Sequence, residues 1–312
     1  MILFIFRRLL WGIPVLLVVA TLTFGIMHVV PGGPFDKEKP LPPEIKANVE
    51  AKYHLDKPVW EQYLRYLGGL IRGDLGPSYK YLGRNVKDII YDTLPVSFEL
   101  GLWAVLLSLL FGVGAGMIAA ARPRSWADHS SMFLAIAGIS IPNFVLGAFL
   151  IMLFAYSLRI LPPALWEGWR HSILPALTLA LLPAAYIARL TRSSLLEVIH
   201  KEFIRTAKAK GFGWTYILFK HALANSISPV VTFLGPLTAT LVTGSFVVEF
   251  IFSVPGMGRF FITAVTNRDY PLIMGVTLVY TVLIVLANII VDVLLAWLDP
   301  RIRMESSPRD RG

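Results

Sequence analysis

The sequence predicts an all-α, polytopic membrane protein with six membrane-spanning helices. First, 55% of its 312 residues are hydrophobic and only 16% are charged. Second, long apolar runs almost free of charge recur along the chain, and third, basic residues gather between alternate runs. A soluble core of this size cannot hide so much apolar surface, so composition outweighs the two globular domains that length alone would suggest.

The net charge of +9 is spread between the apolar runs, which favours membrane flanks over a nucleic-acid partner. The chain has no cysteine, which excludes disulfides and thiolate metal sites. The six histidines are scattered, so we expect no metal site.

The first expected span is Leu9–Val30, which has no acid, lysine or arginine and follows Arg7 and Arg8. Its 22 residues are long enough to cross a hydrocarbon core of ~30 Å. The run is longer than the apolar part of a signal peptide, and residues 31–34 offer no cleavage site. We therefore expect residues 1–30 to form an uncleaved first helix with a cytoplasmic start.

Residues 31–98 are expected to form a long external loop that folds as a small cap. Its polar part, residues 31–95, has ten basic and nine acidic residues, which nearly cancel. Pro43 can open a helix over residues 45–51. Pro58 can open a second helix, whose apolar residues at helical spacing are Trp60, Tyr63, Leu64 and Leu67.

Five further spans are expected in a core domain, residues 99–300: Leu100–Ala121, Ser131–Leu158, Ser172–Ala188, Ala222–Val248 and Leu272–Val291. The first of them carries Gly112, Gly114 and Gly116, a spacing that allows close helix contact. Several spans contain proline, which frees backbone carbonyls and favours a conduit, although proline is also common in ordinary spans.

Basic residues set the expected orientation. The segments expected in the cytoplasm carry fifteen lysines and arginines, against four in the two short external loops. The excess of positive charge predicts six spans with both termini inside. Residues 301–312 are then a cytoplasmic tail.

The segment 197–225 is a basic stretch between two apolar runs and is expected to form a helix–turn–helix elbow. Leu196, Ile199, Phe203 and Ala207 recur at helical spacing and predict one apolar face. Gly211 and Gly213 break that helix. The elbow is predicted to dock another protein through this apolar face, which includes Ala207; the alternative is a basic loop held against lipid headgroups.

Residues 205–211, followed by His221, Ala222 and Leu223, resemble the EAA loop of ABC importer permeases, in particular of the oligopeptide and dipeptide permease family. Arg205 and Thr206 replace the glutamate and alanine of the general pattern, as is usual in that branch. Residues 51–58 and 73–81 also resemble the first periplasmic loop of these permeases. The resemblance implies a type I importer permease fold and an ATPase-coupling role for Phe203, Arg205, Thr206, Ala207, Ala209, Lys210, Gly211, His221, Ala222 and Leu223.

The segment after the fifth expected span resembles the family's short helix at the outer mouth of the pathway. The resemblance implies a periplasmic gate made by Glu249, Pro255, Gly256, Gly258, Arg268 and Asp269. An ordinary interfacial loop is the alternative.

Four polar residues near the spans are candidates for the pathway: Glu99, Asn143, Asn288 and Asp292. Asn288 and Asp292 are four residues apart and share a helical face. Intramembrane ionisable residues are often functional, but for Asp292 we favour a hydrogen bond that packs helices together over direct contact with the substrate.

The resemblance covers nearly the whole chain. It implies an inner-membrane permease subunit of an ATP-driven importer that carries oligopeptides or dipeptides. The implied partners are a paralogous second permease, two cytoplasmic ABC ATPases, a periplasmic peptide-binding protein and membrane lipid.

We expect no cofactor on this chain and no enzymatic activity, because the sequence has no phosphate-binding P-loop and no catalytic constellation. ATP and magnesium would be used by the partner ATPases. Permeases of the same family for nickel chelates, glutathione or another small solute are an alternative. A secondary transporter is a more distant one, because no internal repeat is visible and the spans carry almost no charge.

Overall fold

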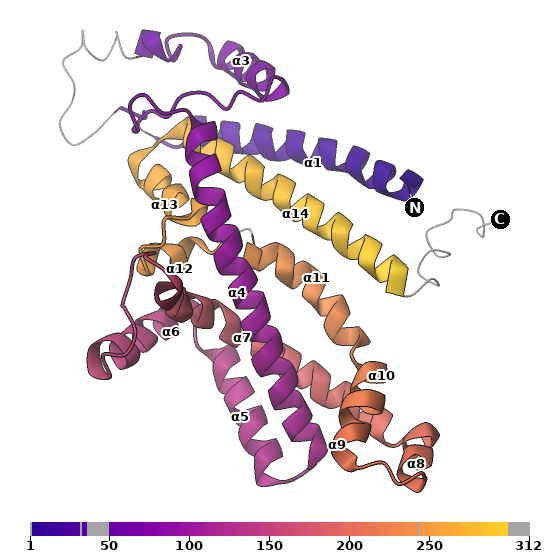
Figure 1. The fold of residues 1–312 in the computed structure, drawn as a ribbon. Helices are drawn as coiled ribbons and strands as arrows, with labels where there is room; N and C mark the ends of the chain where they lie inside the picture. The colour runs from indigo at the N-terminus through magenta and orange to yellow at the C-terminus, as the bar shows by residue number, and fades with distance from the viewer. Residues whose placement is uncertain (1, 32, 36–49, 243, 299–312) are drawn as a thin grey trace.

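The computed structural model describes residues 2–31, 33–35, 50–242 and 244–298, and this part of the chain is helical with no β-strand (Figure 1). The all-α prediction is confirmed. The longer elements are α1 (Ile2–Val29), α3 (Val59–Ile71), α4 (Val86–Ala121), α5 (Trp126–Ser140), α6 (Asn143–Leu150), α7 (Trp169–Ile199), α8 (Glu202–Ala209), α11 (Ser228–Val242), α13 (Met257–Asn267) and α14 (Tyr270–Leu298). The short ones are the π-helices η1 (Ile151–Ser157) and η2 (Ile217–Leu223), and α9 (Trp214–Tyr216), α10 (Ala224–Ser226) and α12 (Phe246–Ile251).

Within the described residues, four helices are long and apolar enough to cross a membrane: α1, α4, α7 and α14. A fifth span arises if Trp214–Ser226 and Ser228–Val242, which meet at an angle of 60°, are counted as one broken helix. The polytopic α-helical class is confirmed, and the number of six spans stays a prediction.

The expected span Ser131–Leu158 is divided in two. Helix α5 ends at Ser140, and α6 begins at Asn143 after an extended Ile141 and Pro142. Proline disfavours the helical conformation of the preceding residue and has no N–H for the helical ladder, so the chain turns here. Apolar content predicted the run but not the break.

The second expected span starts earlier than its apolar residues indicate. Helix α4 begins at Val86, where Asn85 and Asp88 form a capping box, and continues through Pro95. It then packs along α7. A methyl group at Gly112 would lie 2.6 Å from Ile187 Cβ, and one at Gly116 would lie 2.6 Å from Ala188 O. The predicted close helix contact is therefore confirmed at these two glycines, whereas Gly114 has nothing near it.

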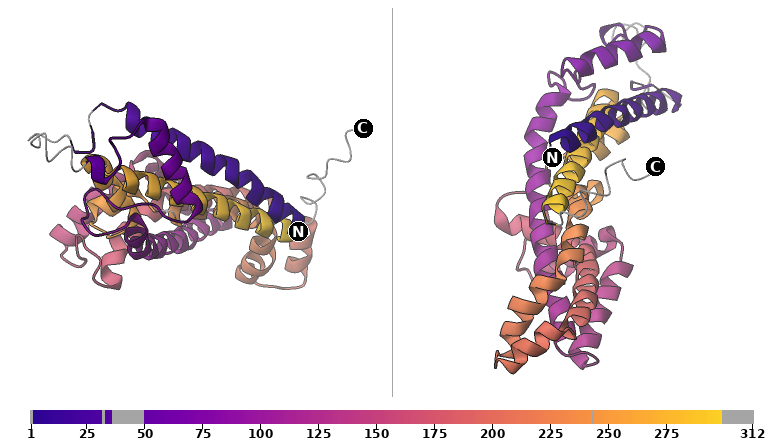
Figure 2. Two further views of the ribbon diagram at one scale, coloured as in Figure 1. Left: turned by 90° about the horizontal axis from the view of Figure 1, so that it is seen from above. Right: turned by 90° about the vertical axis from the view of Figure 1, so that its right-hand side faces the viewer.

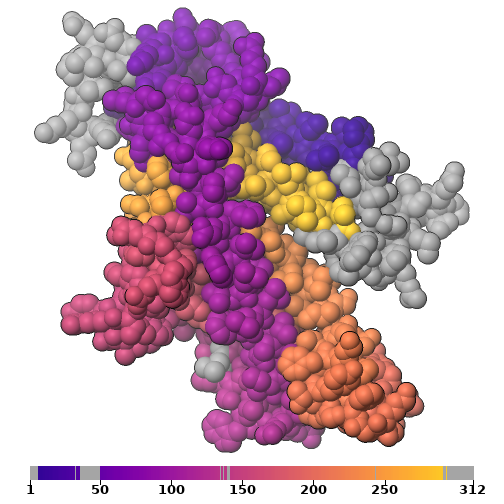
Figure 3. Space-filling view, in the orientation of Figure 1, coloured from indigo at the N-terminus to yellow at the C-terminus, as the bar shows by residue number. Residues whose placement is uncertain are grey.

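The molecule has two distinct ends. Helix α3 lies at one end of α4, beside the start of α14, and the segment from α8 to α10 lies at the other (Figures 1 and 2). We call α3 and residues 72–85 the cap, and residues 197–225 the elbow. Figure 3 shows the elbow as a rounded lobe at the end opposite the cap. The second predicted cap helix is confirmed as α3, whereas the helix expected over residues 45–51 falls largely outside the described residues.

Candidate functional site

The elbow contains one more turn than the sequence pattern predicts. Helix α7 ends at Ile199, residues 200–201 form a turn, and α8 starts at Glu202. Gly211 then turns the chain with φ of +81°, a left-handed conformation that glycine adopts without strain. Gly213 precedes α9 with an ordinary φ of −63°.

The turn before α8 decides which face of the elbow is buried. Ile204 and Ala207 of α8 are buried together with Ile217 and Leu218 of η2, against side chains of α4 and α7. Ala207 is only 5% exposed, so it lies inside the elbow. The prediction that it belongs to the outer docking face is wrong. The expectation assumed one continuous helix from Leu196 to Ala207, and the turn at residues 200–201 removes that periodicity.

The outer surface of the elbow carries the exposed aromatic side chains of Phe203, Phe212, Trp214 and Tyr216, and Phe219 is exposed in a groove beside α4. The Phe212 and Tyr216 rings stack with 5.1 Å between centroids, and the Lys208 ammonium lies 4.8 Å from the Trp214 ring centre. Exposed aromatic groups gathered within one polar lobe mark an interaction site. Sequence reasoning singled out Phe203 but missed Phe212, Tyr216 and Phe219, which the density of aromatic residues could have indicated.

The other residues predicted for coupling fall into two groups. Arg205, Thr206, Ala209 and Lys210 are exposed, and Arg205 approaches Glu202 at 3.8 Å. Ala222 is buried, and His221 and Leu223 are half-buried. The His221 ring lies 5.6 Å from that of Tyr216, so it belongs to the aromatic cluster and not to the charged surface.

An ion pair between buried Asp128 and half-buried Arg192 fixes the helices that lead into the elbow. Arg192 of α7 donates to both carboxylate oxygens of Asp128 in α5, at 2.6 and 2.8 Å. Asp128 also accepts the backbone N–H of Arg124 at 2.9 Å. The hydrogen bond from Arg192 lowers the pKa of Asp128 below its usual value. The fork of two parallel bonds holds α5 against α7 in a defined register.

At the other end, Glu249 lies fully buried at the junction of α12 and α13. Its Oε2 accepts the Gly258 N–H at 2.8 Å and lies beside the Ser97 hydroxyl, which accepts the Met257 N–H at 2.9 Å. A methyl group at Gly256 would lie 2.3 Å from Oε2, so only glycine fits there. Oε1 has no hydrogen-bond partner among the described residues.

Asp269 is the second fully buried carboxylate of this region. It accepts hydrogen bonds from the Ser78 hydroxyl and from the backbone N–H groups of Tyr79, Lys80 and Leu272, the last three at 3.0, 3.3 and 3.4 Å. Asp269 therefore joins the cap to the start of α14. We call residues 246–271 the α12–α13 segment.

The remaining predicted residues are not gathered in one site. Pro255 is exposed, and Arg268 ends α13 with φ of +58° and donates to Gly33 O at 3.4 Å. Of the pathway candidates, Glu99 and Asn288 are exposed and Asn143 is half-buried. The side chain of Asp292 lies outside the described part of the structure. Among the described residues, no group of three His, Asp or Glu side chains could hold a metal ion.

Comparisons with known proteins agree with this architecture. Residues 112–304 match the family described as binding-protein-dependent transport system inner membrane component, and residues 1–101 match its N-terminal part. The dipeptide transport system permease protein DppB of Bacillus subtilis is 47% identical over 289 residues, which cover 93% of this chain and 94% of that protein. The oligopeptide transport system permease protein OppB of Escherichia coli K12 is 45% identical over 302 residues, 96% of this chain and 99% of that protein.

A solved structure supports the fold. A chain of the MetNI methionine ABC transporter, in an inward-facing conformation, superimposes with a TM-score of 0.56 and 17% identity. The match covers 68% of this chain and 96% of that one. The family model and the two permeases at 45–47% identity show that the chain belongs to the family of binding-protein-dependent transport system inner membrane components, and it is a multi-pass protein of the inner membrane.

Proposed function

We propose that this chain is one permease subunit of an ATP-driven importer that carries dipeptides or oligopeptides into the cytoplasm. The proposal rests on the arrangement of side chains in the elbow. Its buried apolar face ties it to α4 and α7, and its opposite face presents aromatic side chains to a partner. A force applied to that outer face would therefore reach the two longest internal helices of the fold.

The partners we propose are two ABC ATPases on the elbow, a second, paralogous permease beside the spans, and an external binding protein at the cap end. A binding protein is implied by the family itself, and ATPases by the transporters to which its relatives belong. The elbow, both termini and the positive charge would lie in the cytoplasm. The chain itself would be non-catalytic, and ATP and magnesium would act on the ATPases.

The proposed movement is a rigid-body one. ATP-driven closure of the ATPases would displace the elbow, and α7 would carry the displacement because it runs without interruption from Trp169 to Ile199. The tight contacts at Gly112 and Gly116 would make α4 follow α7. Packed helices of this kind move as units between discrete arrangements.

Peptides are the proposed substrate because the relatives named above are named dipeptide and oligopeptide permeases. Uptake of labelled Ala-Ala and of a labelled pentapeptide by vesicles containing the complete complex tests this assignment. We expect uptake to require ATP and the binding protein. Uptake of a nickel chelate or of glutathione without peptide uptake would reassign the substrate, and uptake driven by an ion gradient without ATPases would overturn the function.

The orientation is tested separately. Leu82 in the cap and Thr215 in the elbow are both exposed, so Leu82→Cys and Thr215→Cys should react with an impermeant thiol reagent. We expect them to react from opposite sides of the membrane. Ser78 is a poor labelling site, because it is buried and bonded to Asp269.

A further inference from the structure

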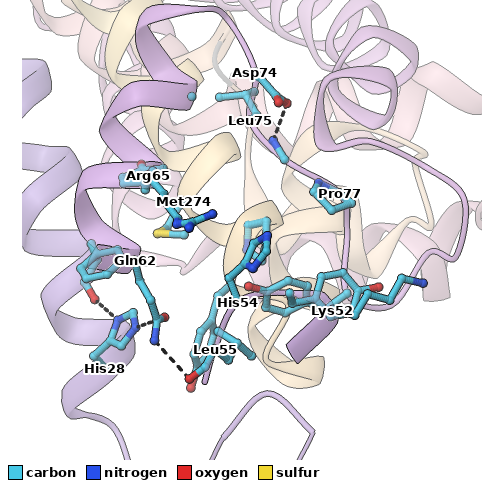
Figure 4. Close-up of a pocket in the computed structure, with 18 residues that line it drawn as sticks. His28, Lys52, His54, Leu55, Gln62, Arg65, Asp74, Leu75, Pro77 and Met274 are labelled. Carbon is cyan, nitrogen blue, oxygen red and sulfur yellow. Dashed lines mark hydrogen bonds between the residues drawn. The ribbon is translucent and has the colours of Figure 1, made fainter. Parts of the chain in front are cut away.

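A cavity of about 350 Å³ lies between the cap and the adjoining ends of α1 and α14 (Figure 4). Its walls come from Phe24 and His28 of α1, from residues 52–55, from α3, from residues 74–79 and from the first turns of α14. We call it the cap pocket. Its volume falls within the range of small-ligand sites, and it contains none of the residues predicted for the pathway.

The walls of the cap pocket are rich in aromatic rings: Phe24, Tyr53, Tyr66, Tyr79 and Tyr270. The rings hold one another in place. Phe24 stacks on Tyr66 with 5.9 Å between centroids, and Tyr53 lies 4.6 Å from Tyr79. Such walls favour a flat ring as ligand, because paired rings attract each other beyond the area that they bury.

The polar groups of the cap pocket differ in their availability. His28 Nε2 and Gln62 Oε1 are 3.2 Å apart, and the Gln62 amide also donates to Leu55 O and Lys57 O at 3.3 and 2.8 Å. These groups are engaged with each other. Arg65 is paired with Glu61 at 3.0 Å.

The Tyr66 hydroxyl is different, because it is buried without a hydrogen-bond partner among the described residues. Burial raises the pKa of Tyr66, so the hydroxyl keeps its proton and can donate. Exposed Lys52 adds a positive charge at the rim. The ligand that fits has an aromatic ring and hydrogen-bond acceptors, one of them able to be anionic.

We propose that the cap pocket binds an aromatic residue of a peptide, with its ring between the tyrosines and its peptide or carboxylate oxygens toward Tyr66 and Lys52. This assignment rests on the proposed peptide transport. It adds an accessory site on the cap that selects for aromatic peptides.

The cap pocket is also joined to the α12–α13 segment. The Tyr79 ring forms one wall, and the Tyr79 backbone N–H donates to Asp269 at 3.0 Å. Tyr270, the next residue, forms another wall. A bound ring would therefore contact Tyr79, whose N–H donates to Asp269, and Tyr270, which follows Asp269 in the chain.

The experiment uses the complete permease–ATPase complex without binding protein, and the probes are the dipeptides Phe-Ala and Ala-Ala. Equilibrium binding should favour Phe-Ala by about tenfold, since the ring adds a large buried apolar area. Leu55→Trp would fill the cap pocket and abolish this preference. Leu64→Trp is the matched control, because Leu64 is exposed on α3 and does not line the cavity.

Two further measurements test the proposal even if Leu55→Trp fails to fold correctly in the cap. Tyr66→Phe removes only the unpartnered hydroxyl and should weaken Phe-Ala binding about three- to fivefold, the contribution of one hydrogen bond. A photoreactive phenylalanine in Phe-Ala should label residues between 53 and 79, in the cap or just before it. Equal binding of the two dipeptides, or labelling confined to α4, α7 and α11, would overturn the proposal.

Ala-Ala uptake, measured separately in vesicles that contain the complete complex together with the binding protein and ATP, distinguishes failure of the cap-pocket proposal from failure of the proposed transport function. Normal uptake without labelling of residues 53–79 would show that the cap pocket is not a peptide site, and the proposed transport function would stand. Cap labelling with no uptake of any peptide would instead remove the transport function. If Leu55→Trp lowered the affinity for the binding protein and left dipeptide binding intact, the occupant would be a protein side chain and the peptide assignment would be wrong.

Discussion

The elbow and the α12–α13 segment are both helix–turn–helix junctions, but they are held together by different forces. In the elbow, the buried side chains are apolar, and the aromatic groups outside are left uncovered by this chain. In the α12–α13 segment, two fully buried carboxylates accept backbone N–H groups from the turns around them. Apolar packing is non-directional, whereas hydrogen bonds to a buried carboxyl group fix distances and angles.

This difference indicates that the two junctions have different roles in transport. A junction held by packing can be displaced as a unit by a partner that covers its outer aromatic surface. A junction held by directional bonds keeps one geometry until those bonds break together. The comparison predicts that substitutions in the α12–α13 segment will act on stability, and that substitutions on the outer elbow will act on coupling.

The largest effect is expected for Asp269→Leu. The change removes the acceptor of the buried Ser78 hydroxyl, of the buried Leu272 N–H and of the half-buried Tyr79 N–H. Each unsatisfied buried donor costs about 1–3 kcal/mol, so we expect a loss of roughly 3 kcal/mol or more. The measurements are thermal unfolding of the detergent-solubilised protein and the rate of proteolysis in residues 72–85, which should rise.

Asp92→Leu is the matched control for Asp269→Leu. Asp92 also bears a carboxylate and is ion-paired, to Arg84, but the pair is exposed. Exposed pairs contribute roughly 0–1 kcal/mol. Equal destabilisation by both substitutions would mean that burial of Asp269 does not determine its role.

The second prediction compares Ala207→Arg with Phe203→Arg in the elbow. Arginine at buried Ala207 would place a charge among Ile204, Ile217 and Leu218, and we expect roughly 3 kcal/mol of destabilisation with loss of ATPase co-purification. Phe203 is 40% exposed, so Phe203→Arg should leave thermal stability within about 0.5 kcal/mol. It should still lower peptide-stimulated ATP hydrolysis and uptake together. Normal coupling in Phe203→Arg would show that the aromatic surface is not the contact.

The third prediction concerns two glycines that are needed for different reasons. Gly256→Ala forces a methyl group against the Glu249 carboxylate and should cost about 1–3 kcal/mol. The methyl group of Gly211→Ala would meet no atom within 4 Å. The only loss of stability comes from holding alanine in the left-handed conformation, about 1–2 kcal/mol. Thermal unfolding ranks them, and Asn at each position separates the causes. Gly211→Asn should recover much of the loss because asparagine tolerates this conformation, whereas Gly256→Asn should be worse than alanine.

The limits of sequence reasoning are visible at the same residues. The fold class followed from apolar runs, and the turn at Gly211 from glycine chemistry, because both depend on local properties of the chain. The break at Pro142 could have been predicted from the proline itself, but the unbroken apolar composition of residues 131–158 favoured a single span. The burial of Ala207 depends on a turn at residues 200–201 that carries no glycine or proline. The bonds between Asp269 and residues 78–80 join segments about 190 positions apart, which no local pattern encodes.

The smallest effect is expected for Lys208→Met. The Lys208 ammonium lies 4.8 Å from the Trp214 ring, and a cation over an exposed ring contributes about 0.5–1 kcal/mol. Methionine keeps a long flexible chain over the ring, so only the charge is lost. Lys210→Met is the matched control, because Lys210 also lies at the C-terminal end of α8 and no aromatic ring lies under its ammonium among the described residues.

Both substitutions remove a positive charge that favours a helix C-terminus, so the difference between them isolates the ring contact. We expect Lys208→Met to be less stable than Lys210→Met by about 0.5 kcal/mol, and the difference to vanish in a Trp214→Leu background. Thermal unfolding of the six proteins in this cycle measures it, and peptide-stimulated ATPase activity should change little in any charge variant. A large loss of coupling in Lys208→Met alone would mean that the partner binds the positive charge of Lys208. The elbow would then not be an apolar docking surface, and its contrast with the polar α12–α13 segment would be wrong.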